Sequence, residues 1–161
     1  RAALVPVAGV LALVGVNAGI LRNEALIADG RPMFVPLAPV DPRSLVQGDH
    51  MQLNFRLPPL AHHPVHGGDA PVVVMRLDPR GVATPVRVED PGAQAPIGPD
   101  ELRVRLVARG GRWVLVTDAW FFPEGDGERL AAAKHGEFRV TPDGRALLVG
   151  LRDAGLRPLT P

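Results

Sequence analysis

The sequence predicts a mainly β protein of the α+β class: one N-terminal transmembrane helix followed by a small antiparallel β meander or open barrel that includes one short helix. Three observations predict this fold. The chain begins with an uncharged apolar run, most of the remainder alternates apolar and polar residues, and Pro- or Gly-containing turns separate the alternating segments. The 161 residues therefore divide into an anchor, residues 1–22, and one β-rich soluble domain, residues 23–161.

The apolar run extends from Ala2 to Leu21 without a charged residue. As a helix it covers about 30 Å, the thickness of the hydrocarbon core of a bilayer. Two alternatives compete with a spanning helix. A cleaved signal peptide has a shorter apolar core and a better cleavage site than Gly15–Ala18 offers, and a buried core helix normally keeps a polar face. We therefore expect a spanning helix.

The charges beside the apolar run do not decide its orientation. Arg1 precedes the run whereas Arg22 and Arg31 follow it, and this count alone would place the larger domain in the cytoplasm. The chain opens on Arg rather than Met, so we expect upstream residues whose charges the count omits. The formal net charge is +1, with both signs spread along the chain, which argues against a basic face for nucleic acid. The absence of cysteine favours neither an oxidising nor a reducing compartment.

Alternation in the soluble part is clearest from His50 to Leu57, where Met51, Leu53 and Phe55 share one face with Leu57. This pattern predicts a half-buried strand. Other alternating segments predict strands at residues 33–37 (an edge strand, because it contains Pro36), 72–77, 82–88, 102–108, 113–117, 136–140 and 146–151. Predicted hairpin turns lie at 78–81, 109–112 and 141–145, and the short helix is predicted within 125–135.

The segment from Gly48 to Phe55 reads GDHMQLNF and resembles the motif that names the bacterial GDYXXLXY protein family. Two positions depart from that name, because His50 and Phe55 each stand where the family has Tyr. The resemblance covers nearly the whole chain. It includes Asn17, Glu24, Gly30, residues 39–44, residues 118–137 and residues 144–151.

The resemblance implies a bacterial inner-membrane protein with a single pass and a periplasmic domain, from a family of unknown function. It also implies a multi-span membrane protein as the partner, next to the lipid bilayer, and it brings neither catalytic residues nor a cofactor. We therefore expect a membrane-anchored, non-enzymatic accessory or interaction subunit.

The motif and the turn before it form a candidate structural or interaction site. Gly48 can adopt a positive φ and the Asp49 carboxylate can accept backbone N–H bonds, so the simplest role of this pair is a turn. Presentation of the carboxylate to a ligand or partner is the alternative. A phenol proton is not needed where Phe55 replaces Tyr, which favours packing over chemistry. The same candidate set includes Asp41, Pro42, Arg43, His50 and Leu53.

Asn17 is the polar residue within the apolar run. A carboxamide among apolar residues favours a hydrogen-bonded partner. Gly15 and Gly19 are four residues apart, a spacing that allows another helix to approach closely. These three residues predict a helix-docking surface; hydration of Asn17 near the end of the run is the alternative.

The competing hypothesis is a periplasmic hydrolase or a ligand- or metal-binding domain. Ser44 precedes a Gly-Asp pair, which is similar to type I signal peptidases. The spacing is short, however, and the Ser-Met-x-Pro context is missing. Lys134 is the single lysine of the chain, and no feature of the neighbouring sequence marks it as a catalytic base. These departures favour a turn or cap role for Ser44.

Two further groups could carry chemistry. His62, His63 and His66 could bind Zn or Ni, but a Pro- and Gly-rich loop with Asp69 as the nearby acid favours a solvated loop. The acids around the Trp120–Phe122 segment could act as in glycosidases, although a solvated turn is the simpler interpretation. They are Asp118, Glu124, Asp126 and Glu128. The aromatic residues of that segment, with Trp113, belong either to the core or to a partner-facing patch.

Overall fold

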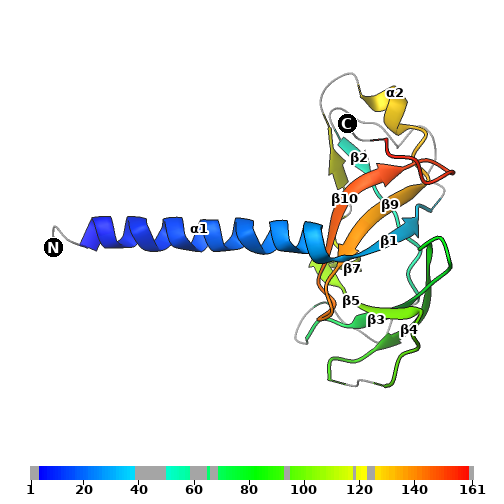
Figure 1. The fold of residues 1–161 in the computed structure, drawn as a ribbon, viewed down its shortest axis with the longest axis horizontal. Coiled ribbons are helices and arrows are strands. Elements are labelled where there is room, and N and C mark those ends of the chain that lie inside the picture. The colour runs from blue at the N-terminus through cyan, green and yellow to red at the C-terminus, as the bar shows by residue number, and fades with distance from the viewer. Residues whose placement is uncertain are drawn as a thin grey trace.

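The computed structural model describes residues 4–38, 50–58, 65, 69–92, 95–117, 119–122 and 126–159. A long helix, α1 (Leu4–Asp29), projects from a β domain that begins directly after it (Figure 1). The other elements, in chain order, are β1 (Arg31–Pro36), β2 (His50–Gln52), β3 (Val72–Leu77), β4 (Ala83–Glu89), β5 (Glu101–Arg105), β6 (Val107–Arg109), β7 (Arg112–Val114), β8 (Ala119–Phe121), α2 (Gly127–Leu130), β9 (His135–Val140) and β10 (Ala146–Arg152).

The structure corrects the prediction of a transmembrane helix. Among the residues that it describes, no helix is both long enough and apolar enough to cross a membrane. The reason lies at the domain end of α1. The helix does not stop where the uncharged run stops but continues without a break to Asp29, and the stretch from Ala12 onward therefore includes Arg22, Glu24 and Asp29.

The β domain contains two three-stranded antiparallel sheets, with strand orders β1-β9-β10 and β4-β3-β5, and two ribbons, β2-β8 and β6-β7. The β-rich content is as predicted, but the topology is not a simple meander. β1 pairs with β9, and β2 pairs with β8, although each pair is far apart in the sequence. β1 lies at the edge of its sheet, as the proline in it predicts.

The predicted hairpin between β3 and β4 forms for a reason that is visible in its turn. The Asp78 carboxylate accepts hydrogen bonds from the backbone N–H groups of Arg80 and Val82, both at 2.8 Å. Gly81 has a φ of 80°, a conformation that glycine adopts without strain. The turn thus fixes which residues of β3 and β4 face each other.

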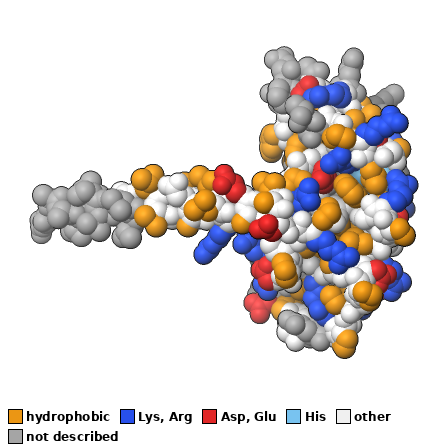
Figure 2. Space-filling model, in the orientation of Figure 1, with side chains coloured by type: hydrophobic (Ala, Val, Ile, Leu, Met, Phe, Trp, Pro, Cys, Tyr) orange, Lys and Arg blue, Asp and Glu red, His pale blue; other side chains and the backbone are white. Residues whose placement is uncertain are grey.

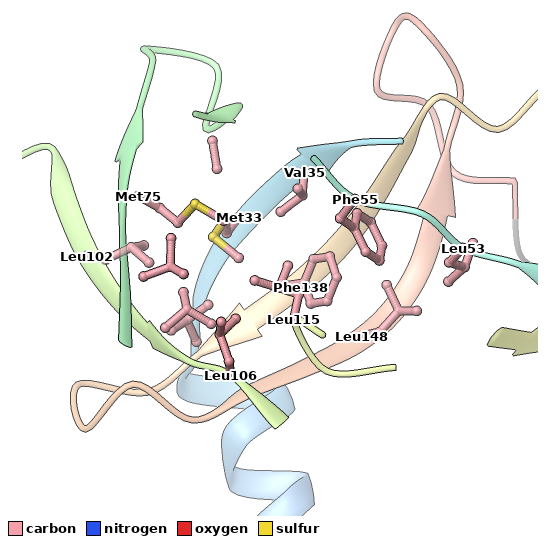
Figure 3. Packing of buried hydrophobic residues seen from close by; sticks show 14 of the residues in the cluster. Met33, Val35, Leu53, Phe55, Met75, Leu102, Leu106, Leu115, Phe138 and Leu148 are labelled. Carbon is pink, nitrogen blue, oxygen red and sulfur yellow. The ribbon is translucent and has the colours of Figure 1, made fainter. Parts of the chain in front are cut away.

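The hydrophobic core lies between the two larger sheets, where their apolar side chains point toward one another (Figure 3). The core includes Met33 of β1, Phe138 of β9 and Met75 of β3, which are all fully buried. The core also receives Leu106 and Leu115 from segments that link the strands. Burial of this apolar surface is the main force that holds the sheets together.

Candidate functional site

Many of the predicted site residues lie outside the part of the chain that the structure describes, so their predicted roles stay predictions. They comprise five motif and turn residues, the candidate nucleophile and the three candidate metal ligands: Asp41, Pro42, Arg43, Gly48, Asp49, Ser44, His62, His63 and His66. Within the described ranges, no group of three His, Cys, Asp or Glu side chains could hold a metal ion.

The second half of the motif is described, and it contributes to the core. His50 begins β2 and is paired with Phe121 of β8. Leu53 and Phe55 are buried, and the ring of Phe55 meets that of Phe138 edge to face, with centroids 5.3 Å apart and planes at 69°. Gly136 makes room for this pair, because a Cβ atom there would lie 3.1 Å from the Phe55 ring.

Helix α1 is exposed to solvent over most of its described length. Figure 2 shows apolar side chains along it and charged side chains toward its domain end. Large apolar residues of α1 are about half or more exposed: Leu13, Val14, Val16, Ile20, Leu21 and Ile27. Exposed apolar side chains are individually ordinary, but a contiguous set of this kind marks an interaction site.

The exposed residues of α1 form two different faces. At 3.6 residues per turn, Leu13, Val16, Ile20 and Ile27 follow one side of the helix with spacings of three, four and seven. We call these four residues the apolar stripe. Gly15 and Gly19 lie on a different side, about a third of a turn around the helix, where a Cβ atom on either would meet nothing within 4 Å. The helix thus offers projecting side chains on one side and a flat surface on another.

Asn17 lies on the exposed part of α1, beside these faces. Its side-chain amide nitrogen donates a hydrogen bond to the backbone oxygen of Leu13, at 2.9 Å within the same helix. The amide oxygen accepts no hydrogen bond from a described residue. Asn17 is therefore partly satisfied by its own helix and keeps an acceptor for a docking partner.

The joint between α1 and the β domain is tight. Leu26 is 3% exposed and anchors the last turn of the helix on the domain. Gly30 then donates its backbone N–H to the oxygen of Leu26 at 2.9 Å. A Cβ atom on Gly30 would lie 2.3 Å from that oxygen and 2.9 Å from the Cβ of Arg139, closer than side chains pack. Only glycine fits this joint without a shift of the backbone.

Beside this joint the surface has a hollow of about 380 Å³, which we call the root hollow. It lies where the end of α1, the start of β5 and the turn after β9 come together. Its lining includes four apolar residues and four charged residues. The full set is Asp29, Arg31, Ile97, Glu101, Leu102, Arg103, Val140, Thr141 and Pro142.

An ion network on the outward face of the β4-β3-β5 sheet forms one wall of this region. Glu101 accepts hydrogen bonds from Arg76 at 2.9 Å and from the backbone of Gly98 at 3.2 Å. Glu89 accepts from Arg87 and Arg103. Both glutamates are buried, which is tolerated because each one is paired with two arginines or with an arginine and a backbone N–H. The network covers the fully buried Val74 of β3.

The network keeps its glutamates ionised. The hydrogen bond from Arg76 is the main cause that lowers the pKa of Glu101 below its usual value of 4.5. Burial tends to raise the pKa of Glu89, but the hydrogen bonds from Arg103 and Arg87 outweigh burial and lower it. A carboxyl group that serves as a general acid near neutral pH needs a raised pKa, so these two glutamates are suited to holding the sheet together rather than to proton donation.

The remaining predicted candidates are described only in part. Lys134 is exposed, and its backbone N–H donates a hydrogen bond to the backbone oxygen of Arg152 at 2.8 Å. Asp126 pairs with Arg129 at 3.0 Å. Asp118 and Glu124 are not described, nor is the side chain of Glu128. Of the aromatic residues, Trp113, Trp120 and Phe122 are partly buried against the core.

Sequence reasoning missed both the root hollow and the ion network. Two alternating pairs, Arg87 with Glu89 and Glu101 with Arg103, are visible in the sequence. Glu89 and Glu101 lie one residue outside the predicted strands 82–88 and 102–108, whereas the observed strands β4 and β5 include them. The pairing of these residues across the sheet depends on β3 lying between β4 and β5, which no local pattern indicates.

A family model described as GDYXXLXY protein matches residues 12–151, which is most of the chain. The chain therefore belongs to the GDYXXLXY family. No curated protein and no solved structure matches the chain significantly.

Proposed function

We propose that this member of the GDYXXLXY family is a non-enzymatic accessory subunit that packs α1 among the helices of a larger partner. The partner class that the family resemblance implies is a multi-span membrane protein. We propose further that the β domain rests beside this partner at the periplasmic face of the bacterial inner membrane.

The observation that carries the proposal is that α1 is exposed on more than one side. A single neighbouring helix covers only one side of another helix. If it packed on the apolar stripe, it would leave Gly15 and Gly19 uncovered on a second side and Val14 and Leu21 on a third. Two or more helices are needed to cover these sides, so a multi-helix partner explains the exposure better than pairing with one copy of the same chain.

Asn17 adds specificity to this packing. Its amide oxygen accepts no hydrogen bond from a described residue and can accept one from a neighbouring helix. Such a bond contributes about 0.6–2 kcal/mol between membrane helices. A partner that offers a donor opposite Asn17 would fix the position of α1 along its axis.

The test is purification of the full-length chain from its native cells in mild detergent, followed by mass spectrometry of the proteins that accompany it. We expect a stoichiometric multi-span protein. Ile20→Asp should reduce its recovery about a hundredfold, because an unpaired charge would be buried in the contact. Asn17→Leu should reduce it about threefold to thirtyfold.

Val86→Asp is the matched control, because Val86 is 40% exposed on β4, away from α1. Its recovery of the partner should equal that of the unmodified chain. Recovery of the chain alone, or equal recovery with Ile20→Asp, would contradict the proposal.

A further inference from the structure

We propose that the root hollow is the part of the partner interface that belongs to the β domain. In this inference, which rests on the proposed function, the hollow receives a large apolar side chain with a neighbouring Lys or Arg from the end of a partner helix that lies along α1. The same partner would then contact the protein at two places, α1 and the root hollow of the β domain.

The shape and lining of the hollow fit an apolar side chain. Ile97 is 38% exposed at its rim, and Leu102, Val140 and Pro142 line it from β5, the end of β9 and the following turn. A volume of about 380 Å³ lies at the lower end of the range of sites that bind small ligands. It therefore suits one or two side chains better than a large cofactor.

The carboxylate of Asp29 favours a basic neighbour for that apolar residue. Glu101 and Arg103 are held in the ion network, and Arg31 is directed to the backbone oxygen of Pro99 at 3.4 Å. No described residue pairs with the carboxylate of Asp29. Asp29 is also the last residue of α1, where the helix dipole is negative, and the last turn contains no basic residue. A cation supplied by the partner would complement both the Asp29 carboxylate and the negative end of the helix dipole.

The position of the hollow continues the helix surface. At 3.6 residues per turn, Gly15, Gly19, Arg22, Leu26 and Asp29 follow one side of α1. Leu26 on this side is covered by the β domain, and Asp29 opens into the root hollow. A partner helix that lies on the flat glycine surface therefore runs toward the domain and ends at the hollow.

The experiment places a photo-cross-linking amino acid at single positions of the full-length chain in its native cells. Ile97 reports on the hollow, Leu13 reports on α1, and Val86 is the control on β4. We expect the same multi-span protein to be cross-linked from Leu13 and from Ile97, and not from Val86. Mass spectrometry of the cross-linked peptide from Ile97 should identify an apolar residue next to Lys or Arg.

The outcomes separate this inference from the proposed function. A cross-link from Leu13 without one from Ile97 would overturn the inference while the proposed function stands. Absence of any protein cross-link would overturn both. A cross-link from Ile97 to a second copy of this chain, or to lipid alone, would also overturn the inference.

A charge reversal gives a second measurement. Asp29→Lys should reduce partner recovery about tenfold, because it would repel the expected basic residue. Asp69→Lys is the matched control, since Asp69 is also an exposed aspartate but lines an adjoining hollow near β4 and not the root hollow itself. Equal recovery with the two variants would contradict the role of Asp29.

Discussion

The two parts of the molecule bury their apolar residues in different ways. In the β domain, Met33, Met75 and Phe138 are fully buried, and outward-facing glutamates are neutralised by arginines. In α1, Leu26 is buried while Leu13 and Leu21 are each 64% exposed. The described part of the β domain thus buries most of its large apolar residues within itself, whereas α1 leaves most of its large apolar residues exposed.

This difference separates stability from association. Substitutions in the core should act on the folding of the domain, because that is where the apolar surface is buried. Substitutions on the exposed part of α1 should leave the folding of the domain unchanged and act on partner binding. The predictions below test that separation, beginning with the largest effect.

Phe138→Ala should cost about 3–5 kcal/mol of unfolding free energy, because it leaves a cavity in the centre of the core. Leu13→Ala, a truncation on the exposed helix, should change the unfolding free energy by less than about 0.5 kcal/mol. Denaturant titration of both variants, followed by the tryptophan fluorescence of the β domain, measures the contrast. Equal losses would show that α1 folds as part of the core.

Gly30→Ala should cost about 1–3 kcal/mol, because the added Cβ would overlap the oxygen of Leu26 and the side chain of Arg139. Gly15→Ala is the matched substitution on the open helix. It meets no atom within 4 Å and should be neutral, or should stabilise the helix by up to about 1 kcal/mol. Thermal unfolding followed by circular dichroism compares the two. A neutral Gly30→Ala would show that the joint is looser than its geometry indicates.

Lowering the pH should weaken the ion network of the β4-β3-β5 sheet without changing the exposure of α1. The folded-state pKa values of Glu89 and Glu101 lie below the ordinary 4.5, so their stabilisation is fully present above that pH and is lost as the pH falls through the folded-state values. Urea titrations across this range should show a declining unfolding free energy. The decline should be smaller in Glu101→Gln, and an identical decline would exclude this glutamate as a cause.

Local patterns predicted the parts of the fold that depend on neighbouring residues. Alternation predicted a strand from His50 to Leu57 with one buried side. Its inner residues Met51, Leu53 and Phe55 are buried and Leu57 is partly buried, but the strand itself, β2, ends at Gln52. The turn residues identified the β3–β4 hairpin. The predicted strand at 102–108 is instead divided into β5 and β6, because Leu106 between them turns into the core and its N–H bonds to Pro71.

Long-range pairing and the end of the helix were not predictable in the same way. The pairing of β1 with β9 joins residues about a hundred positions apart, and no local signal encodes it. The transmembrane prediction was wrong: it rested on the uncharged run alone, whereas the described helix continues past that run and includes Arg22, Glu24 and Asp29. Helices end where capping and packing end them, and here Gly30 and the buried Leu26 do so two turns later.

The joint at Gly30 also has a mechanical consequence. No flexible linker separates α1 from β1, so a pull on the helix reaches the first strand without slack. β1 is an edge strand that pairs with β9 along its whole length, from Arg31 opposite Val140 to Pro36 opposite His135. As Figure 1 shows, β1 leads away from the end of α1. A pull on the helix therefore loads the backbone hydrogen bonds between β1 and β9 together, in shear, and does not open them one at a time.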